Sequence, residues 1–156
     1  MEILIRKGEK PDLPFSLNLI KELAAYENAP NEVVITIDQL EKDGFGENPI
    51  FSFFIAEVNG QIVGMALYYM KYSTWKGKCV FLEDIIVTEQ FRRQGLGKRL
   101  FDAVVNAAKN LNVERLEWQV LAWNEPAIKF YQKVNSNFDN EWINCKLTKE
   151  QIERYQ

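Results

Sequence analysis

The sequence predicts an α+β fold: a mixed, mostly antiparallel sheet flanked by helices, in a single domain over residues 1–156. Two observations indicate this. In the first half, segments rich in Val, Ile and Phe follow one another through short turns, which is typical of antiparallel strands. In the second half, helical and strand periodicity alternate. The length of 156 residues fits one domain, since about 100–200 residues per domain is usual.

The clearest local signal is a β-hairpin. Phe51–Val58 and Gln61–Tyr72 are apolar segments joined by Asn59-Gly60, and Asn-Gly readily adopts the two positive φ values of a type I′ turn. Val80–Thr88 is expected to continue as a third antiparallel strand, and Glu2–Arg6 to form a short first strand.

Two helices are expected between the first strand and the hairpin. Asp12 can cap a helix over Leu13–Ala24, whose apolar residues form one stripe. Thr36 and Gln39 match the capping-box pattern at the start of a second helix, Ile37–Lys42.

The second half is expected to alternate helix and strand. Its predicted elements are a helix over Gly97–Leu111, a strand over Arg115–Ala122, a helix capped by Asn124 and ending at Val134, a strand over Trp142–Leu147 and a terminal helix over Thr148–Tyr155.

Composition limits the classes of function. A net charge of -3 makes nucleic acid an unexpected partner, because phosphate binding needs clustered Lys and Arg. No apolar stretch approaches the ~20 residues that span a membrane. With no signal peptide at the start, Cys79 and Cys145 are expected to be reduced core thiols of a cytoplasmic protein.

Histidine is absent from the chain. This excludes a histidine-based catalytic triad and most zinc-ligand sets, so no metal is expected. A general base must then be a carboxylate, acting directly or through water.

A glycine-bearing loop lies between the third strand of the hairpin region and the long helix. It reads Arg92-Arg93-Gln94-Gly95-Leu96-Gly97. Glycines allow close approach of a pyrophosphate to the backbone, and the helix N-terminus favours negative charge. The alternative is an ordinary turn with solvated arginines, because a short Gly-x-Gly is weak evidence alone.

The loop resembles the acetyl-CoA pyrophosphate loop of GNAT N-acetyltransferases. Further segments resemble one branch of that superfamily, the diamine (spermidine/spermine) and thialysine acetyltransferases, and they span most of the chain. These segments are Leu19–Ala24 with Tyr26-Glu27, Asp43–Gly46, Tyr72–Gly77, Leu82–Asp84 and Trp123–Pro126 with Phe130-Tyr131.

The resemblance implies a GNAT fold whose sheet splays open at the CoA site, and transfer of an acetyl group from acetyl-CoA to a small primary amine. It also implies a homodimer. The residues expected to contact acetyl-CoA are Ile85, Ile86, Val87, Arg92, Arg93, Gln94, Gly95, Leu96, Gly97, Lys98, Asn124 and Tyr131.

The expected catalytic residues are Glu83 and Tyr131. An alkylammonium has a pKa near 10.4 and must lose a proton before it attacks a thioester; Glu83 is the candidate base, and the resemblance places Tyr131 beside the sulfur as an acid. As alternatives, Glu83 and Asp84 only pair with a cation, Tyr131 is helix core, and Asn124 only caps its helix. Adjacent strand residues are expected to point to opposite faces, so only one acid would face the cleft.

The resemblance implies that the amine pocket includes Tyr26, Glu27, Ser73, Trp75 and Asp84, although most acids of this half fit a solvated face equally well. Polyamine-acetylating relatives tend to carry Asp-Pro where this chain has Ser73-Thr74, which favours a thialysine-like amino acid over a polyamine. A protein or peptide acetyltransferase and a non-catalytic CoA-binding sensor remain alternatives. Asn135 stands where relatives often carry glycine, and asparagine tolerates the left-handed conformation expected there.

Overall fold

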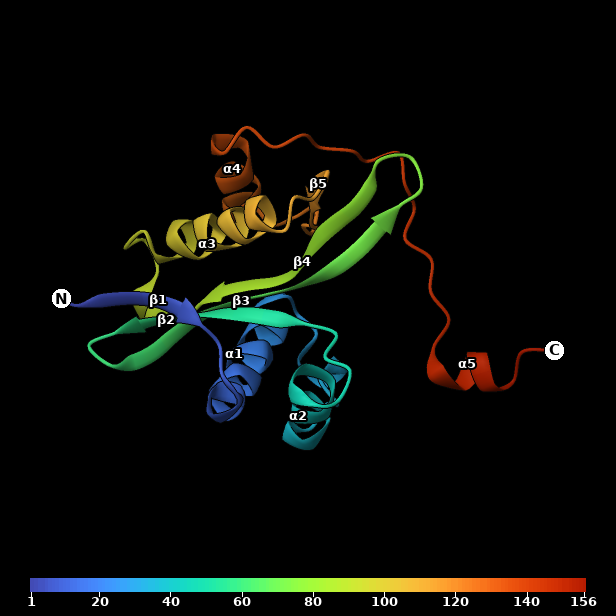
Figure 1. Cartoon of the computed structure of the whole chain (residues 1–156), viewed down its shortest axis with the longest axis horizontal. Helices are drawn as coiled ribbons and strands as arrows, with labels where there is room; N and C mark the ends of the chain where they lie inside the picture. The colour runs from blue at the N-terminus through green and yellow to red at the C-terminus, as the bar shows by residue number, and fades with distance from the viewer. The chain divides into compact units, whose positions relative to one another are not determined.

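The computed structural model describes residues 1–156, which form two compact units, Met1–Gln119 and Val120–Gln156. The first unit contains a five-stranded sheet in the order β1-β2-β3-β4-β5 (Figure 1). The first four strands pair antiparallel and β5 pairs parallel with β4, so the predicted mixed sheet is confirmed. The strands are β1 (Ile3–Lys7), β2 (Ser52–Val58), β3 (Gln61–Ser73), β4 (Gly77–Val87) and β5 (Arg115–Glu117).

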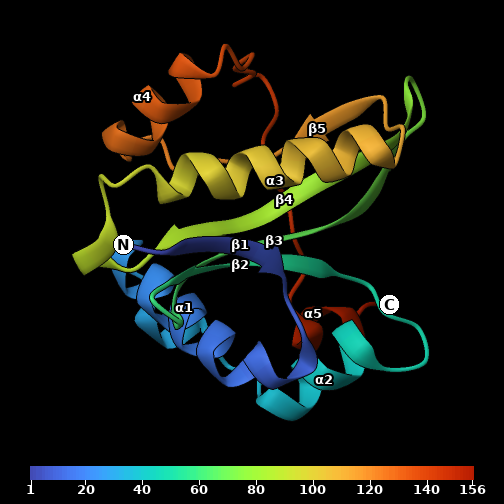
Figure 2. The ribbon, with the colours of Figure 1, turned by 60° about the vertical axis from the view of Figure 1, so that its left-hand side comes forward.

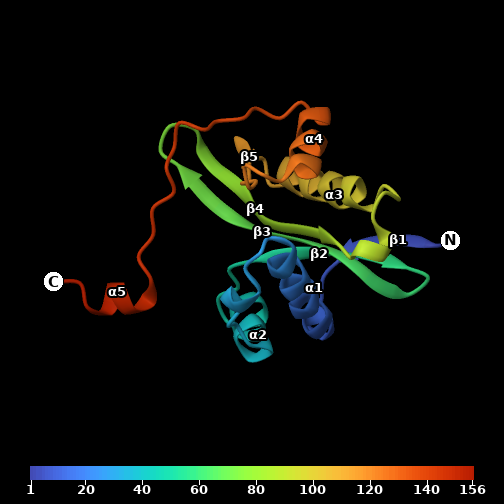
Figure 3. The ribbon, with the colours of Figure 1, turned by 180° about the vertical axis from the view of Figure 1, so that it is seen from behind.

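Helices cover both faces of this sheet. α1 (Leu13–Tyr26) and α2 (Ile37–Phe45) pack on one face, and α3 (Leu96–Asn110) lies across the other (Figure 2). The view from behind shows the same two layers (Figure 3). Short 3₁₀ turns lie at Lys10–Asp12, Pro30–Glu32 and Glu89–Phe91. The core between α1, α2 and the sheet consists of Leu13, Leu17, Leu19, Leu40, Phe53, Ile55, Met65 and Ile86.

Local sequence signals explain several of these elements. Asn59 and Gly60 have φ values of 50° and 80°, which confirms the hairpin turn. The Thr36 hydroxyl accepts from the Gln39 amide at 3.2 Å, and Gln39 Oε1 accepts from the Thr36 amide at 2.9 Å, so the capping box is confirmed. α2 continues past the predicted end at Lys42 to Phe45. None of the helices is long and apolar enough to span a membrane.

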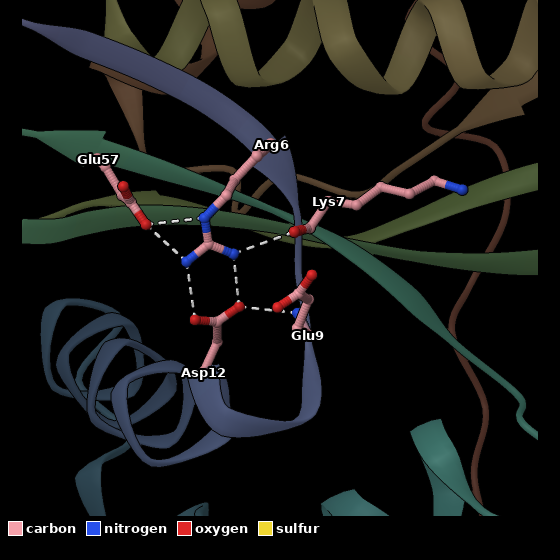
Figure 4. Close-up of polar contacts among 5 residues, drawn as sticks. All are labelled: Arg6, Lys7, Glu9, Asp12 and Glu57. Atoms are coloured by element: carbon pink, nitrogen blue, oxygen red, sulfur yellow. Dashed lines mark hydrogen bonds and ion pairs between the residues drawn. The ribbon is translucent and has the colours of Figure 1, made fainter. Parts of the chain in front are cut away.

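The predicted cap at Asp12 is wrong, because an ion pair uses its carboxylate instead (Figure 4). Arg6 Nη1 donates to Asp12 Oδ2 at 2.7 Å and Nη2 to Oδ1 at 2.9 Å, while Arg6 Nε donates to Glu57 at 2.8 Å. The Glu9 amide also donates to Asp12 at 2.7 Å. Hydrogen bonds from Arg6 lower the pKa of Asp12 although burial opposes them. This cluster joins β1 and β2 to the start of α1.

β4 and β5 separate after a short ladder. Cys79–Phe81 pair with Arg115–Glu117, whereas β4 continues to Val87 without β5. The strand predicted to reach Ala122 therefore ends at Glu117, because its ladder ends there. The edge of β4 that faced β5 is open beyond Phe81, as a splayed sheet requires.

The second unit contains α4 (Glu125–Lys133) and α5 (Lys149–Glu153). Asn124 caps α4 by accepting from the Ala127 amide at 3.4 Å, and Asn135 has the expected left-handed φ of 59°. The predicted strand Trp142–Leu147 is wrong, since an alternating segment becomes a strand only within a ladder and none includes it. Cys145 is exposed rather than in a core, whereas Cys79 is buried.

Candidate active site

A β-bulge in β4 shapes the centre of the candidate site. Asp84 pairs with Leu67 and Leu82 pairs with Tyr68, so Glu83 has no partner in the ladder. A bulge sets two residues of one strand against one residue of its neighbour. The expectation that Glu83 and Asp84 point to opposite faces is therefore wrong: the bulge interrupts the alternation, and both carboxylates lie toward the α1 face.

Three carboxylates gather on this face. Burial raises the pKa of Asp84 to about 6, and the charges of Glu83 and then Glu27 add to the rise. Burial also raises the pKa of Glu27, the C-cap residue that follows α1. None of the three acids forms a salt bridge with a lysine or arginine. The alternative that Glu83 and Asp84 pair with a protein cation is therefore not what the structure shows.

Such a cluster favours a cation from outside the chain. Clustered carboxylates without a counter-ion repel one another, and an alkylammonium placed among them would relieve that repulsion. The charge of the cluster suits an amine substrate.

Glu22 links α1 to the segment that leads into the glycine loop. Its carboxylate accepts from the Thr88 hydroxyl at 2.8 Å and from the Glu89 amide at 3.1 Å. Arg92 Nη2 lies 3.7 Å from the same carboxylate, and Arg92 Nε donates to the carbonyl of Val87 at 2.9 Å. Arg92 is thus held by the chain itself at the end of β4. No local motif predicts this role of Glu22, because its partners lie more than 60 residues away in the chain.

The glycine loop has the shape of an anion-binding turn. Arg93 and Gly95 adopt left-handed φ values of 63° and 79°, and α3 begins at Leu96. A Cβ added at Gly95 or Gly97 would meet no protein atom within 4 Å, so the space in front of the helix N-terminus is open. Free first-turn amides and the helix dipole favour a phosphate there. The loop therefore fits the pyrophosphate of acetyl-CoA.

Side chains around the loop add to this fit. Arg93 and Gln94 are exposed, and Lys98 is exposed and forms an ion pair with Asp102. Ile85, Ile86 and Val87 lie on the part of β4 whose edge is open. Their contacts with acetyl-CoA stay predictions.

The other expected substrate residues lie apart from the acidic cluster. The Ser73 hydroxyl accepts from the amides of Trp75 and Lys76 at 3.3 and 3.2 Å, in the turn that joins β3 to β4. Seven residues of β4 separate this turn from Asp84, on the order of 20 Å along a strand. Trp75 is 80% exposed. Tyr26, by contrast, lies beside the cluster, one residue before Glu27.

Two expected residues belong to the second unit. Tyr131 lies on α4 and is buried, with its ring 5.4 Å from that of Phe130 in an edge-on contact. Asn124 caps the same helix, so the capping role is confirmed. The roles of Tyr131 as acid and of Asn124 toward pantetheine stay predictions.

Comparisons with solved structures identify the fold. An aminoglycoside acetyltransferase from an uncultured soil metagenomic sample, in complex with trehalose, matches with a TM-score of 0.78 at 22% identity, over 94% of this chain and 95% of that one. The aminoglycoside acetyltransferase AAC(6′)-Iy, in complex with a bisubstrate analog of CoA, matches with a TM-score of 0.78 at 22% identity, over 95% and 99% of the two chains.

Sequence comparisons identify the family. The model of the acetyltransferase (GNAT) family matches residues 18–135. Thialysine N-epsilon-acetyltransferase of Bos taurus is 36% identical over 142 residues, covering 86% of this chain and 84% of its own. The Mus musculus enzyme of that name is 38% identical over 136 residues, covering 82% and 80%. The human spermidine/spermine N(1)-acetyltransferase-like protein 1 is 39% identical over 158 residues, covering 95% of this chain and 23% of its own. The chain belongs to the acetyltransferase (GNAT) family and is an acetyl-CoA-dependent N-acetyltransferase.

Proposed function

We propose that this enzyme acetylates the primary amine of a small molecule, a thialysine-like amino acid or a diamine or polyamine, by direct attack on acetyl-CoA in a ternary complex. The observation that carries the proposal is the cluster of Glu27, Glu83 and Asp84, which lacks a basic partner. Relatives named for thialysine and for spermidine or spermine support the same substrate class.

Glu83 acts as the base in this proposal. An alkylammonium with a pKa near 10.4 is almost fully protonated near neutral pH and cannot attack. Glu83 takes the proton, directly or through one water, and leaves a neutral amine with a free lone pair. Glu27 and Asp84 contact the rest of the substrate, including a second ammonium group where the substrate has one.

Acetyl-CoA supplies the activated acetyl group. The glycine loop and the N-terminus of α3 hold its pyrophosphate, and a backbone amide among Ile85, Ile86 and Val87 donates to the thioester carbonyl. Tyr131 protonates the departing thiolate, and Asn124 binds the pantetheine arm. The proposed enzyme is a homodimer and is located in the cytoplasm.

The turn residues Ser73 and Thr74 favour a lysine-like amino acid over a polyamine. The Asp that polyamine-acetylating relatives tend to carry at this position would attract the extra ammonium groups of a polyamine. That attraction is worth about 1 kcal/mol if the carboxylate is solvated. The same Asp would repel the carboxylate of an amino acid during the approach of that substrate, whereas the turn itself lies too far from the acidic cluster to bond an amino acid held there.

The test compares kcat/KM for S-(2-aminoethyl)-cysteine and for spermidine at saturating acetyl-CoA. We expect the lysine analogue to be preferred, and Ser73→Asp to move the preference toward spermidine, with Ser52→Asp on β2 as the matched control. A preference of about tenfold or more for spermidine in the native enzyme would contradict this role of Ser73. Acetylation of peptides but of neither small amine would favour a protein acetyltransferase, and binding of CoA without transfer would favour a sensor.

A further inference from the structure

Tyr69 lies next to the candidate base and belongs to none of the motifs in the sequence. It pairs with Phe81 across β3 and β4, and the two ring centroids are 5.5 Å apart. Lys71 Nζ lies 5.5 Å from the Phe81 ring on the same face. These contacts hold the ring of Tyr69 in one place on the sheet.

The hydroxyl of Tyr69 donates to Glu83 Oε2 at 2.8 Å. Because Glu83 is the unpaired residue of the bulge, the ladder does not fix the position of its side chain. Glu83 is exposed and forms no ion pair. The hydroxyl of Tyr69 is therefore the contact that orients this carboxylate.

The hydroxyl stays a hydrogen-bond donor throughout the working pH range. Burial raises the pKa of Tyr69 to about 12, and the hydrogen bond to Glu83 and the charges of Glu83 and Asp84 add to the rise. A phenol with such a pKa neither loses its proton near neutral pH nor acts as a base there.

We propose that Tyr69 is a positioning residue that fixes the Glu83 carboxylate for proton transfer. The hydroxyl occupies Oε2, so Oε1 is left to take the proton from the ammonium or from an intervening water. The proton moves to Oε1, and the nitrogen keeps the electron pair that attacks the thioester. The inference rests on the role of Glu83 in the proposed function.

The first measurement is the steady-state kinetics of Tyr69→Phe. We expect kcat to fall about tenfold, which corresponds to about 1.4 kcal/mol, while KM for acetyl-CoA stays unchanged. Tyr68→Phe is the matched control, because that neighbouring tyrosine lies on the other face, stacked on Phe54 at 5.7 Å between ring centroids. Tyr68→Phe should keep the native kcat. Stabilisation of Tyr69→Phe to heat by acetyl-CoA verifies that the variant is folded.

A double-mutant cycle separates positioning from a general structural effect. Once Glu83→Gln has removed the base, adding Tyr69→Phe should lower kcat no further, because the two residues act as a unit. The same fold-loss in both backgrounds would overturn the inference. The inference would also be overturned if Tyr69→Phe kept the native kcat while Glu83→Gln had a low kcat. That outcome would leave the proposed function intact. A native kcat for Glu83→Gln would instead remove the proposed base, and the role of Tyr69 with it.

Discussion

The guanidinium of Arg92 lies over the ring of Tyr26, with Cζ 5.1 Å from the ring centroid. Tyr26 is the last residue of α1, directly before Glu27 of the acidic cluster, and Arg92 opens the glycine loop. A cation over an aromatic face is stabilised by about 0.5–1 kcal/mol at an exposed site. The contact therefore ties the end of α1, beside the acidic cluster, to the start of the glycine loop.

Arg92 and its neighbour Arg93 are expected to respond differently to substitution. Arg92→Gln loses the contacts with Glu22, Tyr26 and the Val87 carbonyl, so it should lower the free energy of unfolding of the ligand-free protein by about 1–2 kcal/mol. Arg93→Gln should leave that free energy within about 0.5 kcal/mol, because the side chain is exposed. Both should weaken acetyl-CoA binding, measured by titration calorimetry. Equal stability of the two variants would contradict the account of Arg92.

Asp84 is expected to destabilise the protein above about pH 6. Its pKa is raised to about 6 in the folded state, so between about pH 4 and pH 6 the folded protein binds more protons at this site than the unfolded chain does. The free energy of unfolding therefore falls as the pH rises through that range. Asp84→Asn should raise it by about 3 kcal/mol near pH 8, and the gain should vanish near pH 4. Urea unfolding at both pH values measures this, with the exposed Glu47→Gln as control; a gain independent of pH would refute it.

Asp12 is expected to stabilise the fold in the opposite pH direction. Arg6 lowers the pKa of Asp12, so its contribution is complete above the ordinary carboxyl pKa and is lost as the pH falls through the lowered value. Asp12→Asn should cost about 2 kcal/mol near neutral pH, and less below about pH 4. Glu150→Gln removes an exposed pair in which Arg154 lies 2.8 Å away, and should cost less than about 0.5 kcal/mol. Equal losses in the free energy of unfolding for the two variants would show that the ion pair of Asp12 with Arg6 contributes no more than an exposed pair.

Gly97 offers a clean test of the glycine loop. A Cβ there meets no protein atom, so Gly97→Val should fold, but its side chain would occupy the space that the pyrophosphate needs. At a concentration of 100 Kd acetyl-CoA should stabilise the native protein by about 2.7 kcal/mol and the variant hardly at all. Asn110→Val, at the other end of α3, is the control. Gly95→Val is less suitable because the φ of 79° would strain valine. Unchanged affinity in Gly97→Val would refute the loop assignment.

The sequence predicted the elements whose signals are local. Asn59-Gly60, the capping box at Thr36 and the cap at Asn124 each depend on residues within three positions, and the structure has all three. Asp12 misled because its partner Arg6 comes from a strand. The strand expected at Trp142–Leu147 failed for a related reason: alternation gives no information about a neighbouring strand.

The candidate site was predictable in its residue types but not in its arrangement. Glu83, Asp84 and Glu27 were identified, yet the bulge that turns both strand acids toward one face depends on the register with β3. Tyr69 was missed for the same reason, since its hydrogen bond joins residues 14 positions apart. A local motif does not encode such a pairing.

The central claim is that Glu83 is the base in acetyl transfer to a primary amine. Amine-dependent release of CoA by the native enzyme and by Glu83→Gln tests it most directly. The thiol is measured with a chromogenic reagent, at saturating acetyl-CoA, from about pH 7 to pH 10. The native enzyme should release CoA only when a primary amine such as S-(2-aminoethyl)-cysteine is present. Glu83→Gln should be slower by about 10²–10⁴-fold near neutral pH and should recover in part near pH 10, where free amine is abundant. A Glu83→Gln variant with the native rate and the native pH profile would contradict the account.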